Sequence, residues 1–275
     1  MPEENLAPEA EEQQGDLESS RMPFMEHLGE LRSRLIYSLY AVLGCMCVAF
    51  AFNDELYDFL KKPLIPYLPP GSKLIFTAPA ELFFTYMKIS MLAGVVAASP
   101  VIFYQLWRFV APGLYKHERK LVWPFVGISS LLFISGTVFC YAVIFPVAFQ
   151  FFMSMSTEDI VPMIKVNDYL SFSASMLFIF GLIFETPLVM IFLAKLGVIN
   201  AAMLRKKRRY AILLIFVIAA IATPTPDVVN QTLMAAPLMI FYEISIVFIA
   251  RIDKKRALRE AAEQAENEAE AKASE

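Results

Sequence analysis

Cysteine and histidine are scarce in this sequence, and their positions argue against two common kinds of site. The three cysteines, Cys45, Cys47 and Cys140, all lie inside apolar runs, so we interpret them as small buried hydrophobic residues without a disulfide framework. The two histidines, His27 and His117, are far apart and lack a metal-ligand spacing. The sequence also contains no phosphate-binding loop of the GxxxxGK[ST] form. We therefore expect no metal, no cofactor, no nucleic-acid partner and no enzymatic activity.

Charge is also missing over long stretches of the chain. Charged residues make up 19% of the sequence and hydrophobic residues 57%, whereas about a quarter of the residues in a soluble domain are charged. The apolar residues gather in runs, and about 20 apolar residues in a helix cross the hydrocarbon core of a bilayer. The pattern predicts an all-α integral membrane protein with six transmembrane helices, at about residues 35–53, 82–107, 121–145, 168–194, 210–222 and 228–250.

The distribution of charge around these runs predicts the domain organisation and the orientation. Residues 1–21 are predicted to be an acidic disordered tail, residues 22–252 the transmembrane domain and residues 253–275 a charged tail. The positive-inside rule places both termini in the cytoplasm. With six spans, 19 of the 24 basic residues then lie on that side, and the other side has only Lys61, Lys62, Lys73, Lys88 and Lys165.

The segment before the first span is amphipathic, and we expect it to form a helix at the membrane interface. Glu30 in this segment has two interpretations. It can form a salt bridge with Arg34, one helical turn away. Alternatively, it forms an acidic site with Glu118. The simpler interpretation of Glu118 is that it balances the positive charge of its basic neighbours. Two carboxylates there would accept paired hydrogen bonds from guanidinium groups. The helical positions place Phe24, Leu28, Leu31 and Leu35 on one face and Glu26, Glu30 and Arg34 on the other.

Glu185 is the ionisable residue that the membrane environment makes hardest to explain. It lies within the fourth predicted span, where an ionisable side chain is costly and usually functional. The alternatives are a functional or partner-contacting role and an internal hydrogen bond. An ion-coupled transporter with Glu185 as its proton carrier is the alternative function, although the chain shows no internal repeat. Lys88 and Glu243, near the ends of their spans, are predicted to snorkel toward the interface.

Several motifs, in order along residues 22–250, resemble TatC, the multispanning subunit of the twin-arginine protein translocase. They are His27-Leu-Gly-Glu-Leu-Arg-Ser-Arg-Leu35, Lys62-Pro-Leu-Ile65, Ser99-Pro-Val-Ile-Phe-Tyr-Gln-Leu-Trp107, Phe109-Val-Ala-Pro-Gly-Leu-Tyr-Lys-His-Glu-Arg119, Ser171-Phe172, Phe184-Glu-Thr-Pro187, Leu204-Arg-Lys-Lys-Arg208 and Pro226-Asp-Val-Val-Asn-Gln-Thr232. The family form before Asp227 is Thr-Pro-Pro-Asp, whereas this chain has Thr-Pro-Thr-Pro-Asp.

The resemblance implies a receptor for twin-arginine signal peptides, which exports folded cargo proteins across the bacterial inner membrane by the proton-motive force. Its implied partners are TatA- and TatB-type single-helix membrane proteins, in an oligomeric receptor complex, and it implies that the last two helices are short. Glu30 and Glu118 would bind the signal peptide, with Arg32, Phe109 and Lys116 around them. Pro63 would shape the first periplasmic loop. Glu185 would be the polar group of the membrane face, and Asp227 and Gln231 would lie near the partner contacts.

Overall fold

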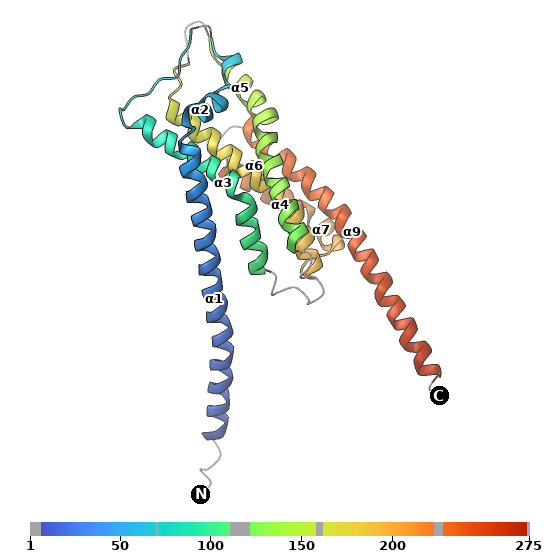
Figure 1. The fold of residues 1–275 in the computed structure, drawn as a ribbon. Helices are drawn as coiled ribbons and strands as arrows, with labels where there is room; N and C mark the ends of the chain where they lie inside the picture. The colour runs from blue at the N-terminus through green and yellow to red at the C-terminus, as the bar shows by residue number, and fades with distance from the viewer. Residues whose placement is uncertain (1–6, 70, 111–121, 158–161, 223–227, 274–275) are drawn as a thin grey trace.

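The computed structural model describes residues 7–69, 71–110, 122–157, 162–222 and 228–273, and the regular elements in these ranges are helices (Figure 1). An isolated bridge joins Ile75 to Lys165. In chain order the helical elements are α1 (Ala7–Phe50), α2 (Asn53–Lys61), the 3₁₀ turn η1 (Ile65–Tyr67), α3 (Glu81–Val110), α4 (Val122–Phe139), the π-helical turn η4 (Cys140–Ile144), α5 (Phe145–Met153), α6 (Val166–Lys195), α7 (Ala201–Lys206), α8 (Arg208–Ala222) and α9 (Val228–Ala273).

Among the described residues, five helical segments are long and apolar enough to cross a membrane. The prediction of an all-α chain with several membrane-spanning helices is therefore confirmed. Helix α8 has 15 residues and corresponds to the fifth predicted span. At about 1.5 Å per residue it reaches roughly 22 Å, less than the hydrocarbon thickness of about 30 Å. The five long segments are Met25–Phe50, Glu81–Val110, Trp123–Met153, Val166–Lys195 and Val228–Leu258.

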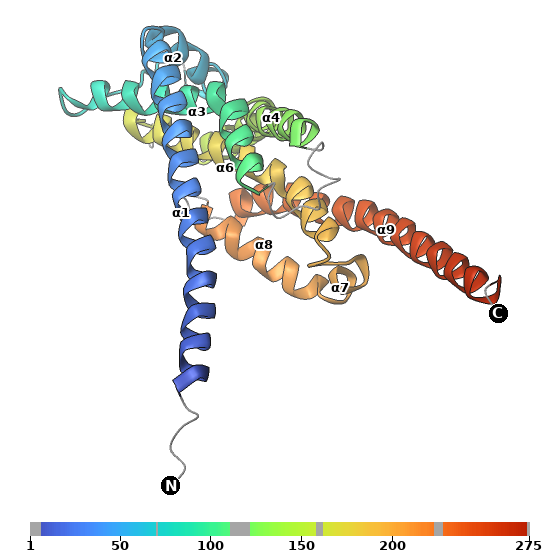
Figure 2. The ribbon, with the colours of Figure 1, turned by 60° about the horizontal axis from the view of Figure 1, so that its bottom comes forward.

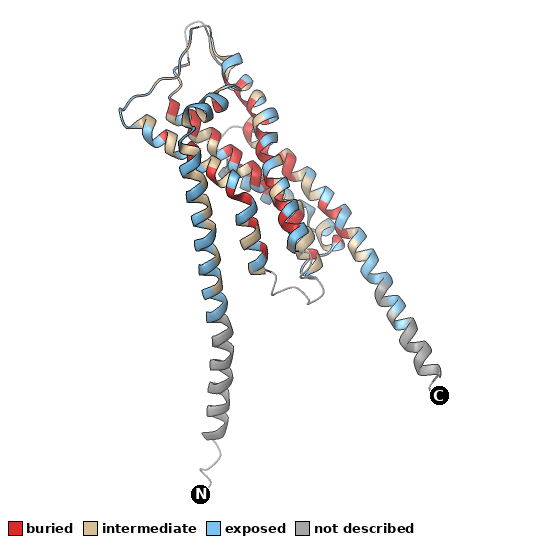
Figure 3. Cartoon of the chain, viewed as in Figure 1, coloured by how far each residue is buried: buried red, intermediate tan, exposed pale blue. Residues whose placement is uncertain are grey.

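Helix α6 lies at the centre of the helical packing (Figure 3). In its most apolar stretch 44% of the residues are buried, whereas none are buried in the corresponding stretch of α1. The side chains of Phe145, Leu170, Met176 and Phe180, fully buried, form the core where α6 meets η4 and α5. Helix α1 lies at the side of the molecule and packs along α3 (Figure 2). Most of the surface of the Met25–Phe50 part of α1 is therefore not covered by other helices.

The third span continues beyond its predicted end at residue 145. Proline in a helix interior removes one backbone hydrogen bond and clashes with the preceding turn, so the sequence predicts that Pro146 kinks or ends the span. Instead, α4 passes through the π-helical turn Cys140–Ile144 into α5, and Pro146 lies in the first turn of α5. The wider π turn changes the local hydrogen-bond register, so the helix accommodates the proline and continues to Met153.

The first and last helices also extend past their predicted limits. Helix α1 begins at Ala7 and includes the segment predicted to form an amphipathic helix at the membrane interface, which continues into the first span without a break. Helix α9 has 46 residues, so the expectation that the last two helices are both short is correct for α8 and wrong for α9. Both extensions are rich in Ala, Glu and Gln or Lys, which are strong helix formers. The predicted tail boundaries at residues 21 and 253 therefore do not coincide with helix ends.

The connector between the first two spans is folded, as its prolines predict. Pro63 separates α2 from η1, and two tyrosines of other elements hold the end of α2. Tyr169 of α6 donates a hydrogen bond to the carbonyl of Leu60 at 2.6 Å. Tyr141 of η4 donates one to the adjacent carbonyl of Phe59 at 2.8 Å. These bonds fix the connector over the ends of α3 and α6.

We expect Tyr169→Phe to destabilise this connector. Tyr169 is only 5% exposed, so removing its hydroxyl leaves the Leu60 carbonyl buried without that donor, at a cost of about 1–3 kcal/mol. Reversible unfolding in mixed detergent micelles measures the loss. The matched control is Tyr141→Phe, whose hydrogen bond is exposed and should contribute less because water replaces it. Equal losses in the two variants would contradict the role assigned to burial.

Two charged residues predicted to snorkel have partners within the protein. Lys88 Nζ donates hydrogen bonds to Asn167 Oδ1 at 2.9 Å and to Ser171 Oγ at 3.1 Å, which joins α3 to α6. Glu243 Oε2 accepts a hydrogen bond from Arg208 Nη2 at 2.7 Å, which joins α9 to α8. Sequence periodicity identifies the end of a span but not the neighbouring helix, so these interhelical bonds could not be predicted.

Candidate functional site

A polar groove lies between α1 and the C-terminal end of α3, with a volume of about 670 Å³. The charged stripe of α1 faces this groove. The opposite, apolar stripe faces outward, where Leu35 is 67% exposed. In a bilayer this orientation presents the apolar stripe to lipid and keeps the charged stripe against the protein. We call it the α1–α3 groove; its lining residues are Glu26, Gly29, Glu30, Ser33, Arg34 and Tyr37 of α1 and Gln105 and Arg108 of α3.

Glu30 lies at the centre of the α1–α3 groove. Arg34 Nη2 donates a hydrogen bond to Glu30 Oε1 at 2.8 Å, so the predicted salt bridge along the helix is present. Arg34 Nη1 donates a second hydrogen bond to Gln105 Oε1 at 3.2 Å, which ties the pair to α3. The other carboxylate oxygen, Glu30 Oε2, is 3.9 Å from His27 Nδ1. Because the Glu30 side chain is 33% exposed, this oxygen remains accessible to a further donor.

Phe109 joins the site through a contact that sequence analysis did not predict. Its ring stacks on that of His27, with centroids 4.3 Å apart and planes inclined by 13°. His27 is one turn from Glu30 along α1, so the stack brings Phe109 close to the carboxylate. The quoted family motifs contain His27, Gln105 and Phe109 but do not indicate which helices meet. Contacts between residues about 70–80 positions apart depend on tertiary packing.

The remaining residues predicted to bind a signal peptide do not lie in the described part of this groove. Arg32 is exposed and does not line it, because two residues along an α-helix rotate a side chain by about 200° from Glu30. Glu118 and Lys116 lie outside the described residues. The geometry therefore unites Glu30 with Phe109 and leaves Arg32 on another face of α1.

Glu185 lies elsewhere, buried between α6 and α4, and is only 7% exposed. Ser129 and the backbone of Phe133, both on α4, lie near its carboxyl group. Ser129 in turn accepts a hydrogen bond from Trp107 Nε1 at 2.9 Å. Glu185 Oε1 has no partner among the described residues. The two interpretations of Glu185, an internal hydrogen bond and a partner-contacting role, therefore both stay predictions.

The residues predicted near the partner contacts are only partly described. Gln231 Nε2 donates a hydrogen bond to the Phe216 carbonyl at 3.0 Å, so this side chain joins α9 to α8. Asp227 lies outside the described residues. Gln231 therefore has a structural contact within the chain, at the junction of the last two helices.

Comparison with known proteins places this arrangement in a family. Residues 26–237 match the family described as Sec-independent protein translocase protein (TatC). The TatC protein of Desulforapulum autotrophicum is 47% identical over 250 residues, which cover 91% of this chain and 92% of that protein. The TatC protein of Escherichia coli K12 is 40% identical over 226 residues, covering 82% and 87%.

A solved structure has the same helical arrangement. The crystal structure of a twin arginine translocase receptor, TatC, superposes with a TM-score of 0.73 at 40% identity, covering 82% of this chain and 98% of that one. The match supports a role in the twin-arginine translocase and confirms that the chain is a membrane transport component, not an enzyme. On the family match, the sequence identities and the fold together, this chain belongs to the TatC family of Sec-independent protein translocase proteins.

Proposed function

We propose that this chain is the signal-peptide receptor and core subunit of a twin-arginine translocase, which exports folded proteins by the proton-motive force. The observation that carries the proposal is the accessible Glu30 carboxylate in the α1–α3 groove. A related TatC structure is described as a translocase receptor. The groove lies at one end of the apolar parts of α1 and α3, so a peptide could reach it from the membrane surface.

The groove chemistry favours arginine over lysine. A guanidinium group is planar and offers several donors, whereas an ammonium is a compact point charge. Glu30 Oε2 is free to accept such a donor, and the stacked rings of His27 and Phe109 offer a flat surface for a guanidinium plane. We propose that Glu118 supplies a second carboxylate, with Arg32 and Lys116 near the bound peptide.

We also propose six spans with both termini in the cytoplasm of a bacterial inner membrane. The start of α1 and the end of α9 extend toward the same side of the molecule, opposite the connector that contains α2 (Figure 1). Helix α8 then crosses as the short fifth span, and either the bilayer is thinned there or flanking residues lengthen the span. The strong excess of basic residues on the side of the termini supports this orientation.

The partners proposed for this chain are TatA- and TatB-type proteins with one membrane helix each. Helices α8 and α9 present apolar side chains outward, and Ile221 of α8 is 80% exposed. Glu185 Oε1, which is buried in this chain alone and has no hydrogen-bond partner among the described residues, is a polar group within the membrane that a rearrangement on partner binding would have to expose. We therefore assign partner contacts to Glu185, Gln231 and Asp227, in an oligomeric receptor complex.

Site-specific photo-crosslinking tests the receptor proposal. A crosslinker at position 33, which lines the α1–α3 groove, should capture an Arg-Arg signal peptide and capture its Lys-Lys counterpart far less. The matched control is a crosslinker at position 35, which is exposed on the opposite stripe of the same helix. Equal capture of both peptides at position 33, or stronger capture at position 35, would reject the groove as the receptor site.

The alternative function, an ion-coupled transporter, predicts proton-coupled flux of small solutes through this chain alone. It requires carboxylates in series with Glu185, whereas Glu243 pairs with Arg208 at the α8–α9 contact. Liposomes containing this chain alone should therefore show no proton-coupled flux of small solutes. Flux that disappears in Glu185→Gln would favour the transporter over the receptor.

A further inference from the structure

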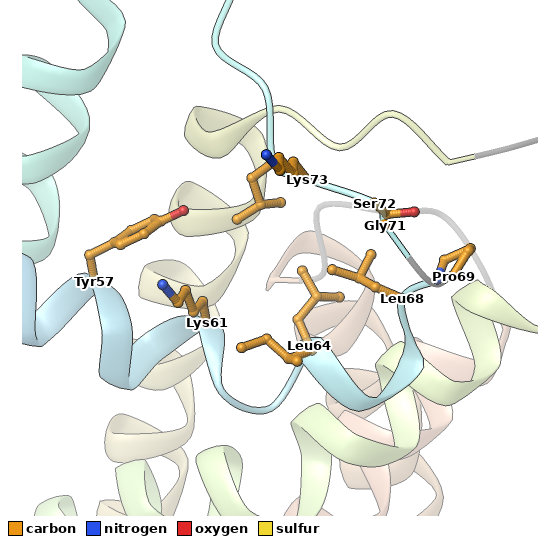
Figure 4. A pocket seen from close by; sticks show the side chains of 10 residues that line it. Tyr57, Lys61, Leu64, Leu68, Pro69, Gly71, Ser72 and Lys73 are labelled. Carbon is orange, nitrogen blue, oxygen red and sulfur yellow. The ribbon is translucent and has the colours of Figure 1, made fainter.

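A cavity of about 580 Å³ opens in the folded connector between α2 and α3 (Figure 4). Two lysines and two hydroxyl residues contribute its polar side, and the remaining side chains are largely apolar. None of the described residues that line it carries a carboxylate. The lining residues are Tyr57, Lys61, Leu64, Ile65, Leu68, Pro69, Gly71, Ser72, Lys73 and Leu74.

Three polar groups point toward the same part of this cavity (Figure 4). They are the ammonium groups of Lys61 and Lys73 and the hydroxyl of Tyr57. Lys61 Nζ lies 4.9 Å from the centre of the Tyr57 ring and donates a hydrogen bond to Asp58 at 2.5 Å. Asp58 is 62% exposed and lies outside the lining. Among the described residues Lys73 has no carboxylate partner, so the cavity carries an excess of positive charge.

The protonation states suit the binding of an anion. The hydrogen bond to Asp58 raises the pKa of Lys61, so its ammonium stays charged. Burial raises the pKa of the Tyr57 hydroxyl, which therefore keeps its proton and can donate a hydrogen bond. All three groups are donors, and none competes with an anion as a charged acceptor.

The rest of the cavity is suited to the apolar part of an amphiphile. Leu64 is almost fully buried, and Leu68 and Leu74 lie beside it in the lining. The connector covers the ends at which α3 and α6 begin, at Glu81 and Val166 (Figure 1). For helices that span a bilayer, this is the level of the lipid headgroups. A soluble anion would use the cations but would leave the apolar side uncovered.

We propose that this cavity binds the phosphate group of an anionic glycerophospholipid through Lys61, Lys73 and Tyr57. Donors from three directions match the tetrahedral array of phosphate oxygens better than a planar carboxylate, and lysine binds phosphate as a point charge. The leucines contact the glycerol and the first carbons of the acyl chains. The bound lipid holds the connector against the membrane surface. This site is separate from the α1–α3 groove and does not depend on its function.

Native mass spectrometry of the full chain in detergent, with added phosphatidylglycerol or phosphatidylethanolamine, tests the site. The wild-type chain should retain more phosphatidylglycerol than phosphatidylethanolamine. The double variant Lys61→Gln/Lys73→Gln should bind it about tenfold more weakly, because two charged donors are lost. The matched control Lys62→Gln/Lys165→Gln removes the same charge from residues outside the lining and should change binding by less than about twofold.

The outcomes separate the proposal from its alternatives. If both double variants bind phosphatidylglycerol equally weakly, only the net charge matters, and the proposed site would be rejected. Inorganic phosphate, titrated into the same samples, distinguishes the source of the phosphate: saturable binding of phosphate without lipid retention would also overturn the proposal. Circular dichroism and gel filtration check the fold. If the double variant does not fold, Lys73→Gln alone, which alters an exposed side chain, should still weaken lipid retention.

Discussion

Glu30→Ala is expected to weaken binding of a twin-arginine signal peptide at least about tenfold while the protein still inserts and folds. A charge-assisted hydrogen bond contributes about 1.5–3 kcal/mol, and about 1.4 kcal/mol is a factor of ten. Glu30 Oε2 is the accessible acceptor in the α1–α3 groove, so its removal eliminates such a bond. Fluorescence anisotropy of a labelled peptide, with the chain in lipid nanodiscs, measures the change in Kd.

The matched control for Glu30 is Glu26→Ala. Glu26 lines the same groove one turn earlier and is exposed, so its loss removes the same charge without removing the central acceptor. Its effect on Kd should stay within about twofold. A Lys-Lys peptide should bind weakly to all three proteins. Wild-type affinity for the Arg-Arg peptide in Glu30→Ala would reject Glu30 as a peptide contact.

Gly136→Ala is expected to destabilise the packing of α4 on α6 by about 1–3 kcal/mol, the usual cost of overpacking. A Cβ at this position would lie 2.5 Å from the Phe180 carbonyl oxygen and 3.0 Å from Gly181 Cα. These atoms belong to the backbone of α6, so no side-chain rotation can relieve the clash, and the two helices must separate. Unfolding of the purified chain in mixed micelles, followed by circular dichroism, measures the loss.

Gly127→Ala provides a control on the same helix. A Cβ at Gly127 would meet no atom within 4 Å, so this variant should retain wild-type stability or gain slightly from the higher helix propensity of alanine. The comparison separates close helix approach from the general effect of replacing glycine. Equal stability of the two variants would show that α4 and α6 are not packed as closely as described.

Much of the fold could be predicted because the hydrocarbon core demands long uncharged helices. The five long spans coincide with predicted apolar runs, and the predicted salt bridge between Glu30 and Arg34 forms because it depends only on helical spacing. The errors lie at helix ends. The sequence predicts that Pro146 kinks or ends its span and that the charged stretches near the termini form tails. Instead, a π turn and strong helix formers let those helices continue.

The groove itself could be predicted only in part. Its α1 side follows from the amphipathic stripe, but its α3 side depends on contacts of Gln105 with Arg34 and of Phe109 with His27. The positions of these pairs in the sequence do not indicate that they meet. Arg32 shows that residues close in sequence can lie apart in the structure. It is only two positions from Glu30, and this spacing places it on another face of the helix, outside the groove.

The sequence by itself determined the all-α membrane class of the protein, the long apolar runs and the family, because composition and motif order are properties of the chain alone. Only the tertiary structure decided which surface of each helix is buried. Periodicity shows which side chains share a face, but the neighbour of that face depends on packing between segments far apart in the chain. For α1 the result is a charged stripe turned toward α3 and an apolar stripe turned outward, which follows from the low cost of exposing leucine to lipid and the high cost of exposing Glu30 there.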